Sequence, residues 1–263
     1  MTRAADRTAD DHQSTLVAVT FEGDSEAAAR RIAAALGLPF RSPADATALE
    51  GELILVHTAS KLELHEPATG IRLWVEYTPA ELRRYLPGAG RDLLRRALGT
   101  KVRRVADATA GLGRDAVHLA CLGYVVTAIE RNVIVAALAQ DGLNRARAAG
   151  LLPHDNPAWS TADAYAVLPT LDPPPEAVYI DPMFPPKRKH SAAVRKEMRL
   201  LRALVHDDRD ALDLLTAARA CATDRVVVKR PDDAPPLAPN PTATYAGKLV
   251  RYDVYRTVRK RSS

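Results

Sequence analysis

Apolar and polar residues alternate along the first hundred positions in a way that predicts a small α/β unit. The segment TLVAVTFE (15–22) has the composition of a strand. The segment DSEAAARRIAAALG (24–37) combines a capping residue, helically spaced alanines and a terminal glycine. Residues 52–77 alternate around a PATG turn, which predicts a hairpin or meander, and residues 78–99 return to helical spacing. We therefore expect a small N-terminal α/β domain over residues 15–100.

From Val102 the pattern changes to strands and helices in alternation. RRVADAT and YVVTAIE are strand-like, whereas GRDAVHLACLG and NVIVAALAQDGLNRARAAG have helical spacing. This order predicts a parallel sheet with helices on both faces. Further strands and helices are expected at residues 176–182, 192–204, 210–222, 224–231, 242–250 and 251–258. A late antiparallel pair on a mostly parallel sheet is typical of the methyltransferase variant of the doubly wound α/β fold, which we expect over residues 101–263.

Composition and charge limit the class of protein and the compartment that the sequence predicts. The 263 residues include 37 Lys and Arg against 32 Asp and Glu, a formal net charge of +5. Cys121 and Cys221 lie beside small or apolar residues, which is typical of reduced core cysteines rather than of a metal site or disulfide. No stretch approaches the ~20 apolar residues of a membrane span. The polar residues 1–14 do not resemble a secretory signal, so we expect a cytoplasmic protein with a disordered N-terminal tail.

A glycine-containing bend, VADATAGLGRDA (105–116), follows the first strand of the second pattern. A dinucleotide fingerprint has three glycines, whereas this bend has Gly111 and Gly113 with Ala116 in the third position. No lysine follows that would hold a triphosphate. Asp107 at the strand end would repel a pyrophosphate but suits the cationic methionine end of S-adenosylmethionine, unless it caps the next helix. We therefore interpret the bend as a seat for this methyl donor.

Acidic residues also follow the next two strand-like segments. The carboxylate of Glu130 can accept both hydroxyl hydrogens of a ribose, or Glu130 is simply a solvated strand end. Asp163, in TADAYAVL, is placed either to reach the adenine amino group or to cap the short helix after it. Both positions are suited to the adenosine part of the methyl donor.

The strongest chemical signal is YIDPMFP, directly after a buried strand. An acidic residue, a proline, any residue and an aromatic form the motif of amino-group methyltransferases. Asp181 can accept an N–H of an aromatic amine and stabilise the positive charge that develops on it. Pro182 helps to aim its carbonyl at the same amine, and Phe184 offers a face for a flipped-out base. The alternative is a rigid turn without chemistry.

Basic residues crowd directly after this motif. Arg195, Arg199 and Arg202 share one face of the expected helix through their spacing. Few aromatic residues are interleaved, so the cluster indicates contacts with a phosphate backbone, the alternative being a solvated face. Two more basic residues end the strand VVVKRP, at the edge where such sheets bind ligands. The RNA-binding candidates are Lys187, Arg188, Lys189, Arg195, Lys196, Arg199, Lys229 and Arg230.

Five blocks between residues 105 and 238 together resemble the ribosomal small-subunit methyltransferase J family. They are DATAGLGRDA, IERNVIVAALAQDGL, YIDPMFP, RKEMRLLRALV and RVVVKRPDDAPPLA, in the family's order and spacing. The resemblance implies methyl transfer from S-adenosylmethionine to the N2 amine of one guanosine in 16S rRNA, free or in an assembling small subunit, without a metal. It implies cofactor contacts by Arg114, Asp115, Glu130, Arg131, Asp163, Ala164 and Asp181.

Three other functions compete with this interpretation. A noncatalytic RNA-binding protein has little need of an intact D-P-M-F motif. An amine methyltransferase for protein glutamine or DNA would share the motif, but the basic helix suits nucleic acid and no separate DNA-reading module is evident. An NAD-dependent oxidoreductase would share the acidic ribose clamp, but the glycine fingerprint is incomplete.

Overall fold

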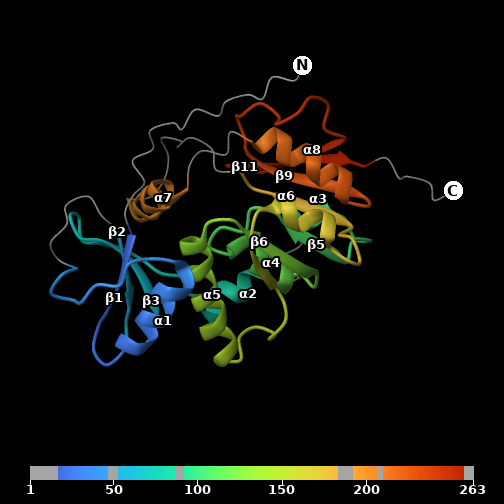
Figure 1. Cartoon of the computed structure of the whole chain (residues 1–263). Coiled ribbons are helices and arrows are strands. Elements are labelled where there is room, and N and C mark those ends of the chain that lie inside the picture. Colours follow the sequence, from blue (N-terminus) through green and yellow to red (C-terminus); the bar gives the residue numbers. More distant parts are fainter. Residues whose placement is uncertain (1–16, 47–52, 87–91, 183–191, 206–209, 258–263) are drawn as a thin grey trace, which may run out of the picture. The chain divides into compact units, whose positions relative to one another are not determined.

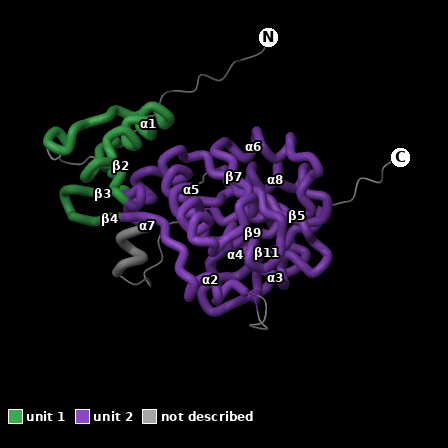
Figure 2. Tube along the Cα trace, turned by 90° about the horizontal axis from the view of Figure 1, so that it is seen from below, with its two compact units in different colours: residues 1–59, 64–72 green, residues 60–63, 73–263 purple. Residues whose placement is uncertain are grey.

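The computed structural model describes residues 17–46, 53–86, 92–182, 192–205 and 210–257. The chain forms two compact units, of which the smaller comprises residues 1–59 and 64–72 and the larger residues 60–63 and 73–263 (Figure 2). In the part of the chain that is described, no helix is long and apolar enough to cross a bilayer. The expected tail, residues 1–14, lies outside the described residues.

The N-terminal part contains a four-stranded sheet with the strand order β1-β2-β3-β4. Figure 1 labels β1, β2 and β3 of this sheet. Its elements are β1 (Val17–Phe21), α1 (Glu26–Leu36), β2 (Leu53–His57), β3 (Leu62–Glu66) and β4 (Ile71–Leu73). β1 and β2 are parallel, and α1 packs against both. The helix ends at Gly37, whose φ of 65° is left-handed, as its terminal glycine predicted. The successive positions of β2, β3 and β4 agree with the predicted meander.

The larger unit begins earlier than the boundary at residue 100 that the sequence suggested. It includes α2 (Pro79–Tyr85) and α3 (Leu93–Leu98). α2 packs against α4 (Arg114–Cys121), and α3 packs against β10 (Ala243–Ala246) and β11 (Val250–Arg256). The apolar side of α3 is buried in the core of the larger sheet, so both helices belong with that sheet although the change of sequence pattern comes after them.

The larger unit is built on a seven-stranded sheet with the order β10-β11-β9-β8-β5-β6-β7. Its other strands are β5 (Arg104–Asp107), β6 (Val125–Glu130), β7 (Ala158–Thr161), β8 (Ala177–Ile180) and β9 (Arg225–Pro231). The pairs from β9 through β8, β5 and β6 to β7 are all parallel, whereas β11 is antiparallel to both β9 and β10. The predicted doubly wound, mostly parallel fold is therefore confirmed, with β11 as its single reversed strand.

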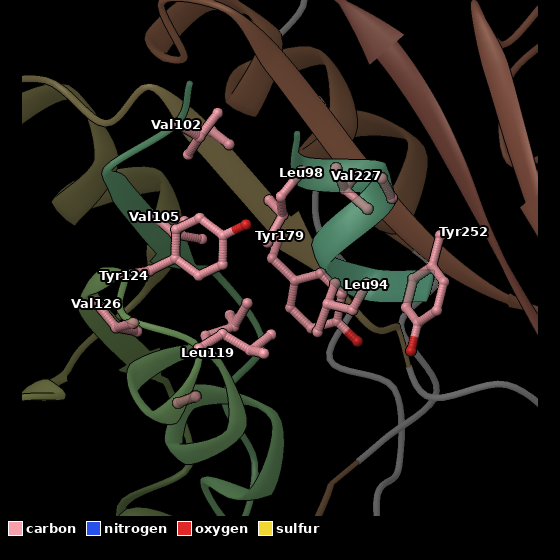
Figure 3. Packing of buried hydrophobic residues seen from close by; sticks show 14 of the residues in the cluster. Leu94, Leu98, Val102, Val105, Leu119, Tyr124, Val126, Tyr179, Val227 and Tyr252 are labelled. Carbon is pink, nitrogen blue, oxygen red and sulfur yellow. The ribbon is translucent and has the colours of Figure 1, made fainter. Parts of the chain in front are cut away.

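Successive residues of a strand point to opposite faces of the sheet, and in the central strands the residues on both faces are apolar. Helices therefore cover both faces of this sheet. The remaining helices are α5 (Val133–Ala148), α6 (Ala164–Val167), α7 (Ala192–Leu204) and α8 (Ala211–Cys221), with a 3₁₀ turn at Leu168–Thr170. One core cluster joins α3 and α4 to Val105 and Tyr179 (Figure 3). The other joins α6 and α8 to Val178 and Ile180. Burial on both faces explains why these strands read as continuous apolar runs.

Candidate functional site

The acidic residues singled out in the sequence gather at one edge of the larger sheet. The chain runs from β5 to β6 and β7 in one direction and places β8 and β9 on the other side of β5, so the topology reverses between β5 and β8. Asp107 ends β5, Glu130 ends β6 and Asp181 directly follows β8. The carboxyl edge at such a switch point is where open α/β sheets bind ligands.

The glycine bend is fixed by contacts on both sides. Gly111 and Gly113 have φ values of 55° and 81°, in the left-handed region that favours glycine. A β-carbon at Gly113 would lie 3.0 Å from the hydroxyl of Tyr77 and 3.2 Å from the ring of Trp159. The Tyr77 hydroxyl also donates to the carbonyl of Leu112 at 3.1 Å. The bend therefore needs glycine at residue 113 for close packing as well as for backbone conformation.

Glu130 is buried and receives two backbone hydrogen bonds. Its Oε2 accepts from the N–H of Gly111 at 2.8 Å, and its Oε1 accepts from the N–H of Asn132 at 2.7 Å. The carboxylate thereby joins the end of β6 to the glycine bend, so Glu130 is not a solvated strand end. A carboxylate oxygen can accept more than one hydrogen bond, so this chemistry also suits a ribose hydroxyl.

Asp107 is only 1% exposed and carries an unpartnered oxygen. Its Oδ1 accepts from the N–H of Thr109 at 3.2 Å, whereas its buried Oδ2 has no hydrogen-bond partner in the described structure. Burial, and then the charges of Asp115 and Asp181, raise the pKa of Asp107 well above its ordinary range. The helix after the bend, α4, has Gly113 as its N-cap residue and no side-chain cap, so Asp107 does not cap it. A buried carboxyl with an unpartnered oxygen fits a cationic ligand group.

Asp115 and Asp181 are bridged by one ammonium group. Lys229 Nζ lies 2.8 Å from Oδ2 of Asp115 and 2.9 Å from Oδ2 of Asp181. The hydroxyl of Tyr179, fully buried on β8, donates to the same Asp115 oxygen at 2.6 Å. The backbone N–H of Asp181 donates to Thr109 Oγ1 at 2.7 Å, which ties the D-P-M-F motif to the glycine bend. The two predicted halves of the site are thus directly connected.

The charges in this cluster stabilise one another. Burial alone would lower the pKa of Lys229, but the charges of Asp181 and Asp115 outweigh it and raise that pKa well above its ordinary range. Burial acts to raise the pKa of Asp115, yet the Lys229 charge and the hydrogen bonds from Lys229 and Tyr179 lower it. Lys229 is therefore an ammonium ion between two carboxylates at neutral pH.

Two of the predicted RNA-binding residues, Lys229 and Arg230, have partners within the protein. Lys229 faces the two carboxylates rather than solvent, with 24% of its side chain exposed. Arg230 is 6% exposed, and its Nε and one terminal nitrogen donate to the carbonyl of Pro235 at 3.0 and 2.6 Å. Both basic side chains near the end of β9 thus have partners within the protein. These internal contacts argue against a role of either residue in holding a phosphate backbone.

Asp163 serves as the N-cap of a short helix, α6. Oδ1 of Asp163 accepts from the N–H of Tyr165 at 2.8 Å at the start of α6, and Ala164 is buried. Nη1 of Arg131 donates to Oδ2 of Asp210 at 2.9 Å, and the hydroxyl of Tyr165 donates to the Asp210 carbonyl at 3.1 Å. The capping alternative for Asp163 is thus observed, and a contact with adenine stays a prediction.

Several predicted residues receive no structural test. Phe184, Lys187, Arg188 and Lys189 lie outside the described residues, and the side chains of Arg195 and Lys196 on α7 are likewise not described. Three other predicted site residues are described. Arg114 is exposed at the start of α4, and Arg199 is exposed on α7. Pro182 is buried directly after Asp181.

Sequence reasoning missed Thr109 and Tyr179. Tyr179 stands two residues before Asp181 on a buried strand, so the period of two could have placed both side chains on the same face. Thr109 lies inside the bend motif, but nothing in the sequence indicates that its hydroxyl accepts from the backbone of Asp181.

Comparisons with known proteins place this geometry in a family. Residues 44–257 match the family model described as "Putative SAM-dependent methyltransferase". Proteins named ribosomal RNA small subunit methyltransferase J, from Yersinia pestis and Yersinia pseudotuberculosis, are each 44% identical over 220 residues, which covers 77% of this chain and 83% of theirs. The crystal structure of the SAM-dependent methyltransferase NGO1261 from Neisseria gonorrhoeae is 30% identical, with a TM-score of 0.70 over 94% of this chain and 97% of that chain.

Proposed function

Because the chain belongs to the SAM-dependent methyltransferase family that includes the ribosomal RNA small subunit methyltransferase J proteins, we propose that it methylates the N2 amine of one guanosine in 16S rRNA. The observation that carries the chemistry is the pairing of Asp107 and Asp181 across the switch point, joined through Thr109. One carboxyl is buried and suits a cation, and the other is 35% exposed and follows a strand end. The site would therefore act from two sides, on a methyl donor and on an amine.

The donor side fits S-adenosylmethionine, which supplies an electrophilic methyl group on a sulfonium centre when it is bound. The unpartnered Oδ2 of Asp107 would face the cationic methionine end, and Glu130 would accept from the ribose hydroxyls. The proposed cofactor-binding residues are Asp107, Gly111, Gly113, Arg114, Asp115, Glu130, Arg131, Asp163, Ala164 and Asp181.

The amine side centres on Asp181. The lone pair of the guanine amine is delocalised into the ring, so the amine is a weak nucleophile until its N–H is polarised. Asp181 would accept that N–H and stabilise the positive charge as it develops, and the carbonyl of Pro182 would accept the second N–H. Phe184 would stack on the flipped-out base, a contact typically worth ~1–3 kcal/mol per base.

RNA phosphates would be held beside this edge, on the basic segment that begins after the motif. The proposed contacts are Lys187, Arg188, Lys189, Arg195, Lys196 and Arg199. Since Lys229 and Arg230 are bound within the protein, they are left out of this set. The partner would be 16S rRNA or an assembling small subunit, in the cytoplasm.

The first test is transfer of tritium from labelled S-adenosylmethionine to unmodified 16S rRNA, 30S particles, 23S rRNA, duplex DNA and a glutamine-containing protein. We expect N2-methylguanosine from the 16S substrates only. Asp181→Asn should lose at least a hundredfold in turnover because the polarising carboxylate is gone. The matched control is Asp155→Asn at an exposed aspartate, which should leave turnover unchanged. Label in DNA or glutamine, or normal turnover of Asp181→Asn, would refute the proposal.

A further inference from the structure

Lys229 holds the two sides of the site together. We propose that Lys229 is a positioning residue that bridges the carboxylates of Asp115 and Asp181, and thereby keeps Asp181 ionised and fixed in orientation for the target amine. The proposal rests on the proposed function, because it assigns Asp181 to the amine. It gives this lysine a role different from RNA binding, which its place at a strand end suggested.

The geometry allows this role because Lys229 contacts two elements at once. It extends from β9, and its ammonium lies 2.8 Å from Asp115 on α4 and 2.9 Å from Asp181 after β8. Asp115 is itself anchored by the Tyr179 hydroxyl at 2.6 Å. The ammonium therefore has a fixed partner on one side and sets the rotation of the Asp181 carboxylate on the other.

The charge balance of the cluster makes the ammonium necessary. Asp107, Asp115 and Asp181 lie close enough that the charges of Asp115 and Asp181 both raise the pKa of Asp107. Lys229 provides the positive charge between Asp115 and Asp181. Without it, carboxylates in a partly buried site repel one another, and one of them takes up a proton. A protonated Asp181 could not stabilise positive charge on an amine.

Several titratable groups on the surrounding elements act on this cluster. Lys229 meets Asp181 and Asp115, and Tyr252 on β11 also acts on it. Other titratable groups near the cluster are Tyr179 on β8, Asp107 on β5 and His118 on α4, whose charge acts on Asp115. Burial raises the pKa of Tyr179 and of Tyr252, so neither phenol ionises near neutral pH.

The test follows the Asp181 carboxyl directly by carbon-13 NMR titration of the protein without cofactor, with the resonance assigned by its absence in Asp181→Asn. In Lys229→Met the titration midpoint of Asp181 should rise by about one pH unit or more, because an opposite charge within ~4–6 Å is lost. The midpoint of the acid limb of the profile of kcat against pH should move to higher pH together with the Asp181 midpoint. Lys229→Arg keeps the positive charge, so both midpoints should stay close to their wild-type values.

The matched control is Arg256→Met, which removes an exposed cation paired with Asp224 at 3.3 Å at the other end of β11. It should shift neither quantity. If Lys229→Met does not fold by circular dichroism, Lys229→Met/Asp115→Asn is compared with Asp115→Asn alone, and the same rise is expected. An unchanged Asp181 midpoint in the folded variant would overturn the proposal. This titration needs no RNA, so a wild type without activity on 16S rRNA would refute the proposed function alone.

Discussion

Replacing Gly113 with alanine separates backbone strain from crowding in the glycine bend. The new methyl group would lie 3.0 Å from the Tyr77 hydroxyl and 3.2 Å from the Trp159 ring. Tyr77 is buried, and Trp159 packs against the core cluster. A left-handed conformation costs an alanine about 1–2 kcal/mol. Overpacking a tight contact adds about 1–3 kcal/mol. Gly113→Ala should therefore lower the free energy of unfolding by about 2–5 kcal/mol.

The control is Gly123→Ala, at a glycine with a φ of 90° and no atom within 4 Å of the new β-carbon. It should show the backbone cost alone, about 1–2 kcal/mol. Guanidinium denaturation with equal m-values would give both free energies, and isothermal titration calorimetry would show weaker binding of S-adenosylmethionine for Gly113→Ala only. Equal destabilisation of the two variants would refute the reasoning that contacts with Tyr77 and Trp159 require a glycine.

Two further predictions concern the buried carboxyls. The pKa of Asp107 is raised in the folded chain, so its contribution to stability is present at acid pH and is lost as pH rises through the folded-state value. In urea denaturation, the free energy of unfolding of Asp107→Asn should therefore exceed that of the wild type at pH 8 but not at pH 4. The variant should also bind S-adenosylmethionine more weakly. The same pH dependence of stability in variant and wild type would contradict this reasoning. Glu130→Gln keeps one acceptor oxygen for the two N–H groups of Gly111 and Asn132, so cofactor affinity should fall at least tenfold by calorimetry, whereas exposed Glu26→Gln should leave it unchanged.

The sheet and the acidic positions were predictable because they depend on local pattern. Apolar runs followed by Asp107, Glu130 and Asp181 place each carboxylate at a strand end, and in a parallel sheet these ends share one edge. The domain boundary was not predictable in this way. The residues of α2 and α3 read as part of the preceding unit, but their apolar faces pack on strands and a helix that come later in the chain.

The role of Lys229 lay beyond sequence reasoning for a related reason. In RVVVKRP the two basic residues, Lys229 and Arg230, come after a run of buried valines near the end of the strand. From this pattern alone, both side chains are expected at the exposed edge of the sheet where ligands bind. Their partners are Asp115, Asp181 and the Pro235 carbonyl; the carboxylates lie 114 and 48 residues away from Lys229 in the chain. Only the strand order, which sets β9 beside β8, brings these groups together.

The same cluster bears on how an RNA base could reach the site. Two carboxylates, those of Asp115 and Asp181, flank a single ammonium, so the edge of the sheet is favourable for a cation and unfavourable for a phosphate. A polyanion therefore cannot be held at the carboxylates themselves. Under the proposed function, the phosphates must be bound by basic residues outside the cluster, and only the uncharged base can enter it. Base flipping is then a consequence of electrostatics as well as of reach, since it separates the neutral target from its charged backbone.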